Sequence, residues 1–356
     1  MQTSGQSILK INLAALVRNW NKFKNLGAPI TSAVIKANAY GIGAKECAIS
    51  LQEAGCTNFF VAHLEEAIEA RKFISANCRI FVLNGIFDQQ SDLFLEFDLI
   101  PILNSIEQFD LFQNKIANHK YGLHIDTGMN RLGIRYDDFD DIFKIKASKN
   151  QPILIMSHLA SASNRDALQN TIQNARFQTL KSHFDKCDFS LSASAGSLLG
   201  QDFLYDLIRP GIGLYGGNPM DNEANLFEPL VQILSPIIQI RKVKKDETIG
   251  YGASFKAQKD IEIGILPIGY ADGIIRAIGN CGKAFINGQI TNILGRISMD
   301  LIAIDLENIK SAKLGDFVEI YGPNIKIDDQ ANCANTISYE LLTRLGSRFK
   351  KIYHHD

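Results

Sequence analysis

Eight short apolar runs between residues 30 and 216 limit the folds open to this chain. In order, the runs are ITSAVIK, NFFVAH, RIFVLNG, DLIPILN, YGLHID, PILIMSH, DFSLSAS and LIRPGIGLYG. The segments between them, such as residues 63–74 and 164–184, have the periodicity of amphipathic helices. Alternating strands and helices favour a parallel sheet, and eight strands fit a closed barrel better than an open sheet. The sequence therefore predicts an α/β chain with an N-terminal (β/α)8 barrel of the TIM type.

Each run has an apolar body and carries a polar or reactive residue towards its C-terminal end. These residues are Lys36, His63, Asn84, Asn104, Asp126, His158, Ser194 and Arg209. The carboxyl ends of the strands in a parallel barrel meet at one rim, where such barrels build their active sites. We therefore expect these side chains to converge there.

The pattern changes after residue 225, where segments such as DIEIGILPI, AFINGQITNIL and DFVEIYG are rich in β-formers. Helical periodicity returns only in TISYELLTRLGSRF near the end. We expect a barrel domain over residues 1–225 and a mainly β domain over residues 226–356. The boundary lies near residues 226–229, and residues 1–10 could pair with the second domain.

Composition excludes several classes of function. The formal net charge of −1 on 356 residues argues against a nucleic-acid or membrane-surface partner. The start, MQTSGQSILK, lacks the pattern of a signal peptide, and no uncharged apolar stretch approaches the roughly 18 residues of a membrane helix. Six cysteines without metal-ligand spacing predict reduced thiols and no metal site. These features favour a cytoplasmic enzyme or binding protein.

Lys36 stands where a buried strand ends, in the stretch AVIKANAYGIGA. Burial favours the neutral form of a lysine, which is the form that attacks an aldehyde to give a Schiff base. A lysine at a strand end can also simply reach out to solvent. Taken alone, Tyr40 is a packing residue that could also reach an anion.

The eighth run contains Arg209-Pro-Gly-Ile212, in a position where barrels of this type often bind phosphate. Ser194 offers a hydroxyl, while Gly211 and Ile212 offer backbone N–H groups. An ordinary salt bridge of Arg209 is the alternative. A phosphate site beside a Schiff-base lysine suggests pyridoxal 5′-phosphate as the cofactor.

The roles of two further residues stay undecided on the residues alone. His158 could be structural, whereas Arg131, in DTGMNRLG, could bind a carboxylate through both nitrogens. Nothing in the residues alone makes Tyr251, in GYGASF, catalytic.

The motifs together resemble those of the alanine racemases, which depend on pyridoxal phosphate. The matching stretches, in order, are AVIKANAYGIGA, DTGMNRLG, MSHLAS, SLSASAG, IRPGIGLYG, GYGASF, PIGYADG, GRISMD and TISYELLTRLGSR. They span nearly the whole chain, and the set is specific although each motif is weak. The resemblance implies a barrel followed by a β domain, and a head-to-tail homodimer with shared active sites that interconverts L- and D-alanine.

The resemblance also implies roles for single residues. Lys36 would bind the cofactor and act as the acid or base for the D-substrate, with Tyr251 of the partner subunit serving the L-substrate. Arg131 and, from the partner, the backbone N–H of Met299 would bind the substrate carboxylate. Arg209 would face the pyridine nitrogen, which should stay unprotonated because arginine does not readily give up a proton. The positions that match cofactor-binding residues are Lys36, Tyr40, His158, Ser194, Arg209, Gly211, Ile212 and Tyr339, and those that narrow the entrance are Tyr270 and Tyr339.

The sequence departs from the family pattern at two positions. Many members have a lysine, often carbamylated, where this chain has His124, so the group that orients Arg131 stays open. Ala193 replaces the usual asparagine before Ser194, which removes one polar contact. Three alternatives remain: a racemase for another or broader amino acid, a decarboxylase of basic amino acids, against which Arg209 argues, and a barrel-only carrier of pyridoxal phosphate, against which the second domain argues.

Overall fold

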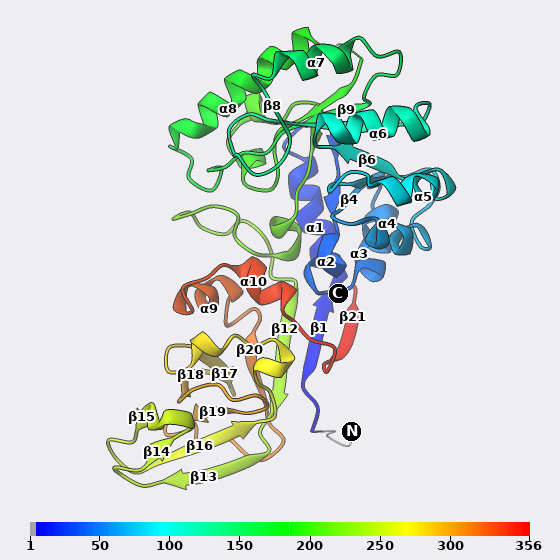
Figure 1. Ribbon diagram of the computed structural model, residues 1–356. Coiled ribbons are helices and arrows are strands. Elements are labelled where there is room, and N and C mark those ends of the chain that lie inside the picture. Colours follow the sequence, from blue (N-terminus) through cyan, green and yellow to red (C-terminus); the bar gives the residue numbers. More distant parts are fainter. Residues whose placement is uncertain (1–4, 185) are drawn as a thin grey trace.

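The structure, a computed structural model, describes residues 5–184 and 186–356. The chain forms an α/β body, blue to green in Figure 1, and a β-rich body, yellow to red, with β1 and β12 running between them. Buried residues of both bodies belong to one continuous apolar cluster. The two bodies therefore share a core.

The α/β body is a barrel of short parallel strands. Its strands are β2 (Ile30–Thr31), β3 (Ala33–Val34), β4 (Asn58–Val61), β5 (Arg79–Val82), β6 (Ile100–Leu103), β7 (Gly122–Asp126), β8 (Ile134–Arg135), β9 (Leu154–Met156), β10 (Asp188–Ser190) and β11 (Leu207–Ile208). Strands β3 to β10 pair in the order β10-β9-β7-β6-β5-β4-β3, with β8 beside β7. Strand β11 closes the circle, because it pairs with β2 while the N–H of Arg209 donates to the carbonyl of Ser192 at 2.9 Å.

The α/β body contains the helices α1 (Leu13–Lys24), α2 (Lys36–Tyr40), α3 (Ala44–Glu53), α4 (Leu64–Arg71), α5 (Ser91–Glu96), α6 (Ile106–Ile116), α7 (Phe139–Lys146) and α8 (Leu168–Thr179). Of these, α2 lies at the carboxyl end of β3, and the others cover the outside of the barrel. Helix α1 begins where the side chain of Asn12 accepts the N–H of Ala15 at 2.9 Å, an N-cap, and its apolar face is buried. Element α2 is not an ordinary helix, since its residues 37–40 have positive φ.

The β-rich body is one nine-stranded sheet with small additions. Its strands are β1 (Ile8–Asn12), β12 (Val231–Pro236), β13 (Gln239–Val243), β14 (Thr248–Ile249), β15 (Phe255–Lys256), β16 (Ile261–Leu266), β17 (Lys283–Ile286), β18 (Gln289–Leu294), β19 (Ile302–Asp305), β20 (Phe317–Tyr321) and β21 (Lys350–His354). The order of the large sheet is β13-β16-β19-β18-β17-β20-β12-β1-β21. Helices α9 (Ile327–Cys333) and α10 (Ser338–Thr343) lie between this sheet and the barrel (Figure 1).

The predicted fold class is confirmed: a (β/α)8-type barrel precedes a mainly β domain. Strand β1 pairs antiparallel with β12 and parallel with β21, so the chain starts in the β-rich sheet before it enters the barrel. Residues 1–4, part of the segment for which pairing was predicted, lie outside the described residues, and the boundary at residue 225 stays a prediction. No helix in the described ranges combines the length and apolar character needed to cross a membrane.

The prediction that all six cysteines are reduced thiols is wrong for two of them. Cys281 and Cys333 form a disulfide, with their Cα atoms 5.9 Å apart. They are separated by 52 residues and meet because α9, which ends at Cys333, packs against the turn at residues 276–278. Short-range spacing gives no sign of such a pair.

Candidate active site

A cavity of ≈ 590 Å³ lies at the carboxyl ends of the barrel strands. Its lining includes most of the site residues that the sequence suggests: Lys36, Tyr40, Arg131, His158, Ser194, Arg209, Gly211, Ile212 and Tyr339. The apolar part of the wall, which the sequence reasoning missed, includes Val34, Phe60, Leu83 and Met156. The structure thus brings residues from seven strand ends and from α10 together in one place.

The charge of this cavity is one-sided. Lys36, Arg131 and Arg209 line it together with two histidines, and the described lining residues include no aspartate or glutamate. A chamber with low-dielectric walls and charges of one sign favours a ligand of the opposite sign. The cavity is therefore suited to an anion, and more than one anionic group could be held in it.

Lys36 lies two residues after the last residue of β3 and is partly buried at the cavity wall. Burial lowers the pKa of its amine, and the positive charge of Arg131 lowers it further, while Glu66 acts in the opposite direction. Both larger effects favour the neutral amine. A neutral amine is the form that adds to an aldehyde.

In the same cavity, Ser194 and the loop after β11 form a small polar cradle. The hydroxyl oxygen of Ser194 accepts the backbone N–H of Gly211 at 2.8 Å and that of Gly213 at 3.2 Å. A Cβ on Gly211 would lie 2.3 Å from the hydroxyl of Tyr40, so only glycine leaves that space open. The N–H groups of Gly211 and Gly213 fix the Ser194 oxygen and leave its own hydrogen to be donated to an anion such as a phosphate.

Arg209 is buried and fixed by oxygen atoms rather than by a carboxylate. Its guanidinium donates to the carbonyls of Ser157 at 2.6 Å and Ser190 at 2.8 Å, and to the hydroxyl of Ser190. Burial lowers its pKa, but the neutral oxygens around it satisfy a charged guanidinium. The side chain is therefore a rigid, positively charged part of the cavity wall.

His124, on β7, lies near Arg209 and is only 6% exposed. Its Nδ1 lies 2.9 Å from Oδ1 of Asn104, whose amide nitrogen donates to the carbonyls of Leu83 and Ile102. Because the amide N–H groups of Asn104 are used, its oxygen must accept, and Nδ1 of His124 carries the proton. Burial and the charge of Arg209 lower the pKa of His124 to about 4, so the ring is neutral.

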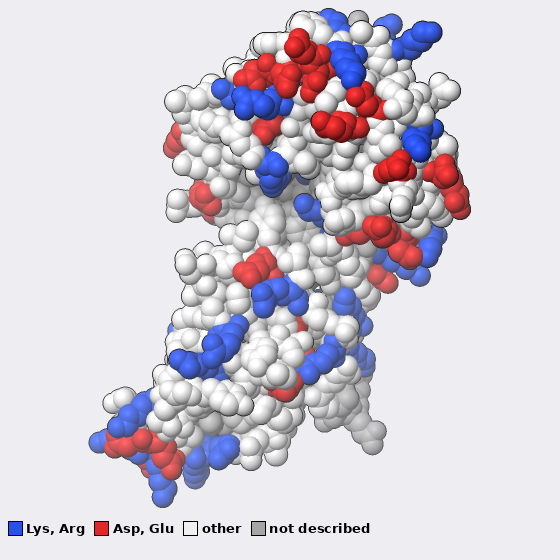
Figure 2. Space-filling model, viewed as in Figure 1, with Lys and Arg blue, Asp and Glu red and all other residues white. Residues whose placement is uncertain are grey.

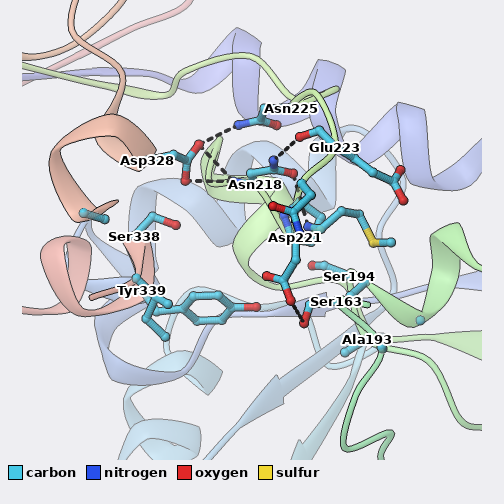
Figure 3. Close-up of a pocket in the computed structure, with 18 of the residues that line it drawn as sticks. Ser163, Ala193, Ser194, Asn218, Asp221, Glu223, Asn225, Asp328, Ser338 and Tyr339 are labelled. Atoms are coloured by element: carbon cyan, nitrogen blue, oxygen red, sulfur yellow. Dashed lines mark hydrogen bonds between the residues drawn. The ribbon is translucent and has the colours of Figure 1, made fainter. Parts of the chain in front are cut away.

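A second, larger cavity of ≈ 940 Å³ adjoins the first and shares His158, Ser194 and Tyr339 with it. Figure 3 shows Tyr339, from α10, extending its ring across this cavity towards Ser163 and Ser194. Burial raises the pKa of Tyr339 to about 12, so its hydroxyl stays protonated. A hollow between the two bodies, with basic side chains at its margin, is visible in Figure 2. Tyr339 therefore stands between the inner cavity and this outer space.

Three of the suggested site residues lie elsewhere on the chain. Tyr251, Tyr270 and Met299 belong to the β-rich body, and they are 70%, 39% and 53% exposed. None of them lines the cavity at Lys36 in the same chain. Tyr251 instead borders a separate hollow of the β-rich body.

Comparison with known proteins decides the family. The family model described as "Alanine racemase, N-terminal domain" matches residues 11–219, and "Alanine racemase, C-terminal domain" matches residues 230–353. The chain belongs to the alanine racemase family. This confirms the resemblance seen in the motifs.

Individual alanine racemases are similar over nearly their whole length. "Alanine racemase, biosynthetic" of Agrobacterium fabrum is 37% identical, over 97% of this chain and 93% of its own. The alanine racemase of Bartonella henselae, solved with covalently bound pyridoxal phosphate, has a TM-score of 0.91 at 34% identity. The match covers 99% of this chain and 100% of that one. The biosynthetic alanine racemase of Pseudomonas aeruginosa has a TM-score of 0.93 at 30% identity, with 99% of this chain and 100% of its own covered.

Proposed function

We propose that this protein is a pyridoxal-phosphate-dependent alanine racemase, which interconverts L-alanine and D-alanine. One observation carries the proposal: a lysine amine, its pKa lowered by burial, shares a cationic cavity with a phosphate cradle, and the described residues that line this cavity include no carboxylate. Family membership and the position of the barrel groups at or just beyond the carboxyl ends of the strands support it.

The cavity fits the cofactor in charge and in donor chemistry. Lys36 would carry it covalently, and Ser194, Gly211, Ile212, Tyr40 and Tyr339 would hold its phosphate. His158 and Arg209 would line its ring, with Arg209 at the ring nitrogen. When bound, pyridoxal phosphate acidifies the Cα–H of an attached amino acid by withdrawing electrons.

Racemisation requires a proton to leave one face of Cα and another to reach the opposite face. Lys36 would act on one face, serving the D-substrate, and Tyr251 of the partner subunit would act on the other, serving the L-substrate. Tyr251 is exposed and does not line the cavity of its own chain, which supports a role in the site of a second subunit. We therefore propose a homodimer with shared active sites.

The remaining groups would hold the substrate. Arg131, exposed in the loop after β7, would bind the carboxylate, together with the backbone N–H of Met299 from the partner. Tyr270 and Tyr339 would narrow the entrance and favour a small side chain such as the methyl of alanine. We place the enzyme in the cytoplasm, where it would supply D-alanine for peptidoglycan or serve D-alanine catabolism.

Chiral chromatography tests the proposal. Purified protein with pyridoxal phosphate is incubated separately with L-alanine, L-serine, L-lysine and L-arginine. The proposal predicts rapid formation of D-alanine and much slower conversion of the others. Comparable turnover of another amino acid would change the substrate to a broader one, and no D-product from any of them would refute the function.

A further inference from the structure

Four consecutive residues after Lys36 adopt an unusual backbone conformation. Ala37, Asn38, Ala39 and Tyr40 have φ values of 52°, 53°, 51° and 56°, and none of them is glycine. In this left-handed region the Cβ of an L-residue crowds the following carbonyl oxygen, which makes such turns unfavourable on their own. Strain of this kind persists where surrounding contacts over-determine it, and it gathers at functional sites.

Contacts inside the segment supply part of the support. The N–H of Gly41 donates to the carbonyl of Ala37 at 2.8 Å, and Oδ1 of Asn38 accepts the N–H of Ala44 at 2.8 Å. A further hydrogen bond comes from a distant part of the chain, the carboxylate of Glu66 on α4. That carboxylate accepts the N–H of Ala37 at 2.6 Å.

The two oxygens of Glu66 have separate tasks. Oε1 accepts the N–H of Ala37, whereas Oε2 accepts the N–H groups of Ala62 at 2.8 Å and His63 at 3.2 Å. The Oε2 contacts cap the start of α4, an ordinary role for an acidic residue at this position. The Oε1 contact is different, because it ties the first turn of α4 to the residue next to Lys36.

The position of this contact matters because the turn places two cavity groups. Lys36 stands at its start, and Tyr40 at its end sends its hydroxyl to the space beside Gly211. The ring of Tyr40 packs against Tyr215, with centroids 4.6 Å apart. A shift of the turn would therefore move the amine and the cradle hydroxyl together.

From these contacts we infer that Glu66 is a positioning residue, which holds the left-handed turn so that Lys36 and Tyr40 can contact the cofactor at the same time. This inference rests on the proposed function. The carboxylate is also an anion close enough to act on Lys36, where it opposes the effects of burial and Arg131. A plain helix cap, without any effect on the turn, is the competing explanation.

Glu66→Gln separates the two explanations, because a glutamine has one acceptor oxygen instead of two. The cap offers two N–H groups and the turn only one, so the amide oxygen should stay with the cap and the NH2 group should face the N–H of Ala37. The variant should keep its melting temperature but lose the hydrogen bond from the N–H of Ala37 to residue 66, which we call the brace. Glu65→Gln, an exposed change on the same helical turn, is the matched control.

Two readouts are measured on both variants. The dissociation constant for pyridoxal phosphate, from absorbance titration of the apo-protein, should rise about tenfold or more in Glu66→Gln and stay unchanged in Glu65→Gln. Hydrogen exchange of the Ala37 amide should accelerate in Glu66→Gln while that of Ala62 stays slow. Unchanged affinity and unchanged Ala37 exchange would overturn the inference.

Wild-type exchange provides a test even if the variant fails to fold. The Ala37 amide should then be protected to a degree similar to the Ala62 amide, and rapid exchange at Ala37 would overturn the brace. Failure of the wild type to bind pyridoxal phosphate would refute the proposed function, whereas the exchange readout would still decide the role of Glu66.

Discussion

The buried imidazole of His124 should make the folded protein sensitive to acid. In the unfolded chain this histidine takes up a proton below its ordinary pKa of 6.5, whereas in the fold burial and Arg209 hold its pKa at about 4. As the pH falls from 6.5 to 4, the unfolded state therefore binds more protons than the native state, and stability is lost. Above pH 6.5 both forms are neutral and the residue contributes no pH dependence.

The size of the effect follows from the two pKa values. Each pKa unit corresponds to about 1.4 kcal/mol, so His124 alone should remove about 2 kcal/mol of unfolding free energy by pH 5 and about 3 kcal/mol by pH 4. The residue is almost completely buried, so solvent screening should reduce this little.

Urea unfolding at pH 7 and pH 5 measures this loss of unfolding free energy. His124→Gln keeps an N–H donor for Asn104 but cannot titrate. Between pH 7 and pH 5 the free energy of unfolding should therefore fall by about 2 kcal/mol less in this variant than in the wild type. Titration of carboxylates cancels in this comparison. His355→Gln, which changes an exposed histidine near the C-terminus, should behave like the wild type. Equal pH dependence in His124→Gln and the wild type would refute the reasoning.

Three further predictions concern the disulfide, the dimer and the phosphate cradle. Cys281→Ser should remove up to about 4 kcal/mol of stability under oxidising conditions, as expected for a loop of this length closed by Cys333, and should change nothing in excess dithiothreitol; equal melting curves in oxidising buffer would contradict this. Mixing inactive Lys36→Ala and Tyr251→Phe subunits should restore activity, to about a quarter of the wild-type level after random exchange, because one site of each mixed dimer is intact. No recovery, with exchange verified by mass, would argue against shared sites. Gly211→Ala should weaken pyridoxal phosphate binding about tenfold in absorbance titrations, since its methyl group displaces the adjacent tyrosine hydroxyl, and wild-type affinity would show that the loop yields instead.

Much of the fold could be predicted because the signals for it are local. Strand and helix periodicity alternate along residues 30–216, and each of the eight apolar runs contains a strand of the barrel. The residue at the end of a strand in a parallel barrel must lie at the common rim. Lys36, His158, Ser194 and Arg209 could thus be grouped from sequence, although their individual roles remain predictions.

The features that could not be predicted depend on tertiary packing. Residues 37–40 contain no glycine that would indicate a left-handed turn. The turn donates a hydrogen bond to a residue of α4, Glu66, which the sequence alone does not distinguish from the other acidic residues of an amphipathic helix. The partners Cys281 and Cys333 are 52 residues apart. The hydrogen bond between Asn104 and His124, which fixes the tautomer of the imidazole, likewise joins two different strands.

The central claim is that Lys36 carries the cofactor in this cavity, and chemical trapping tests it most directly. The holoenzyme is reduced with sodium borohydride, digested, and its peptides are identified by mass spectrometry, with Lys36→Ala treated in parallel. Our account predicts one phosphopyridoxyl group, located on Lys36 and absent from the variant. A label on another lysine, or an equal label in Lys36→Ala, would contradict it.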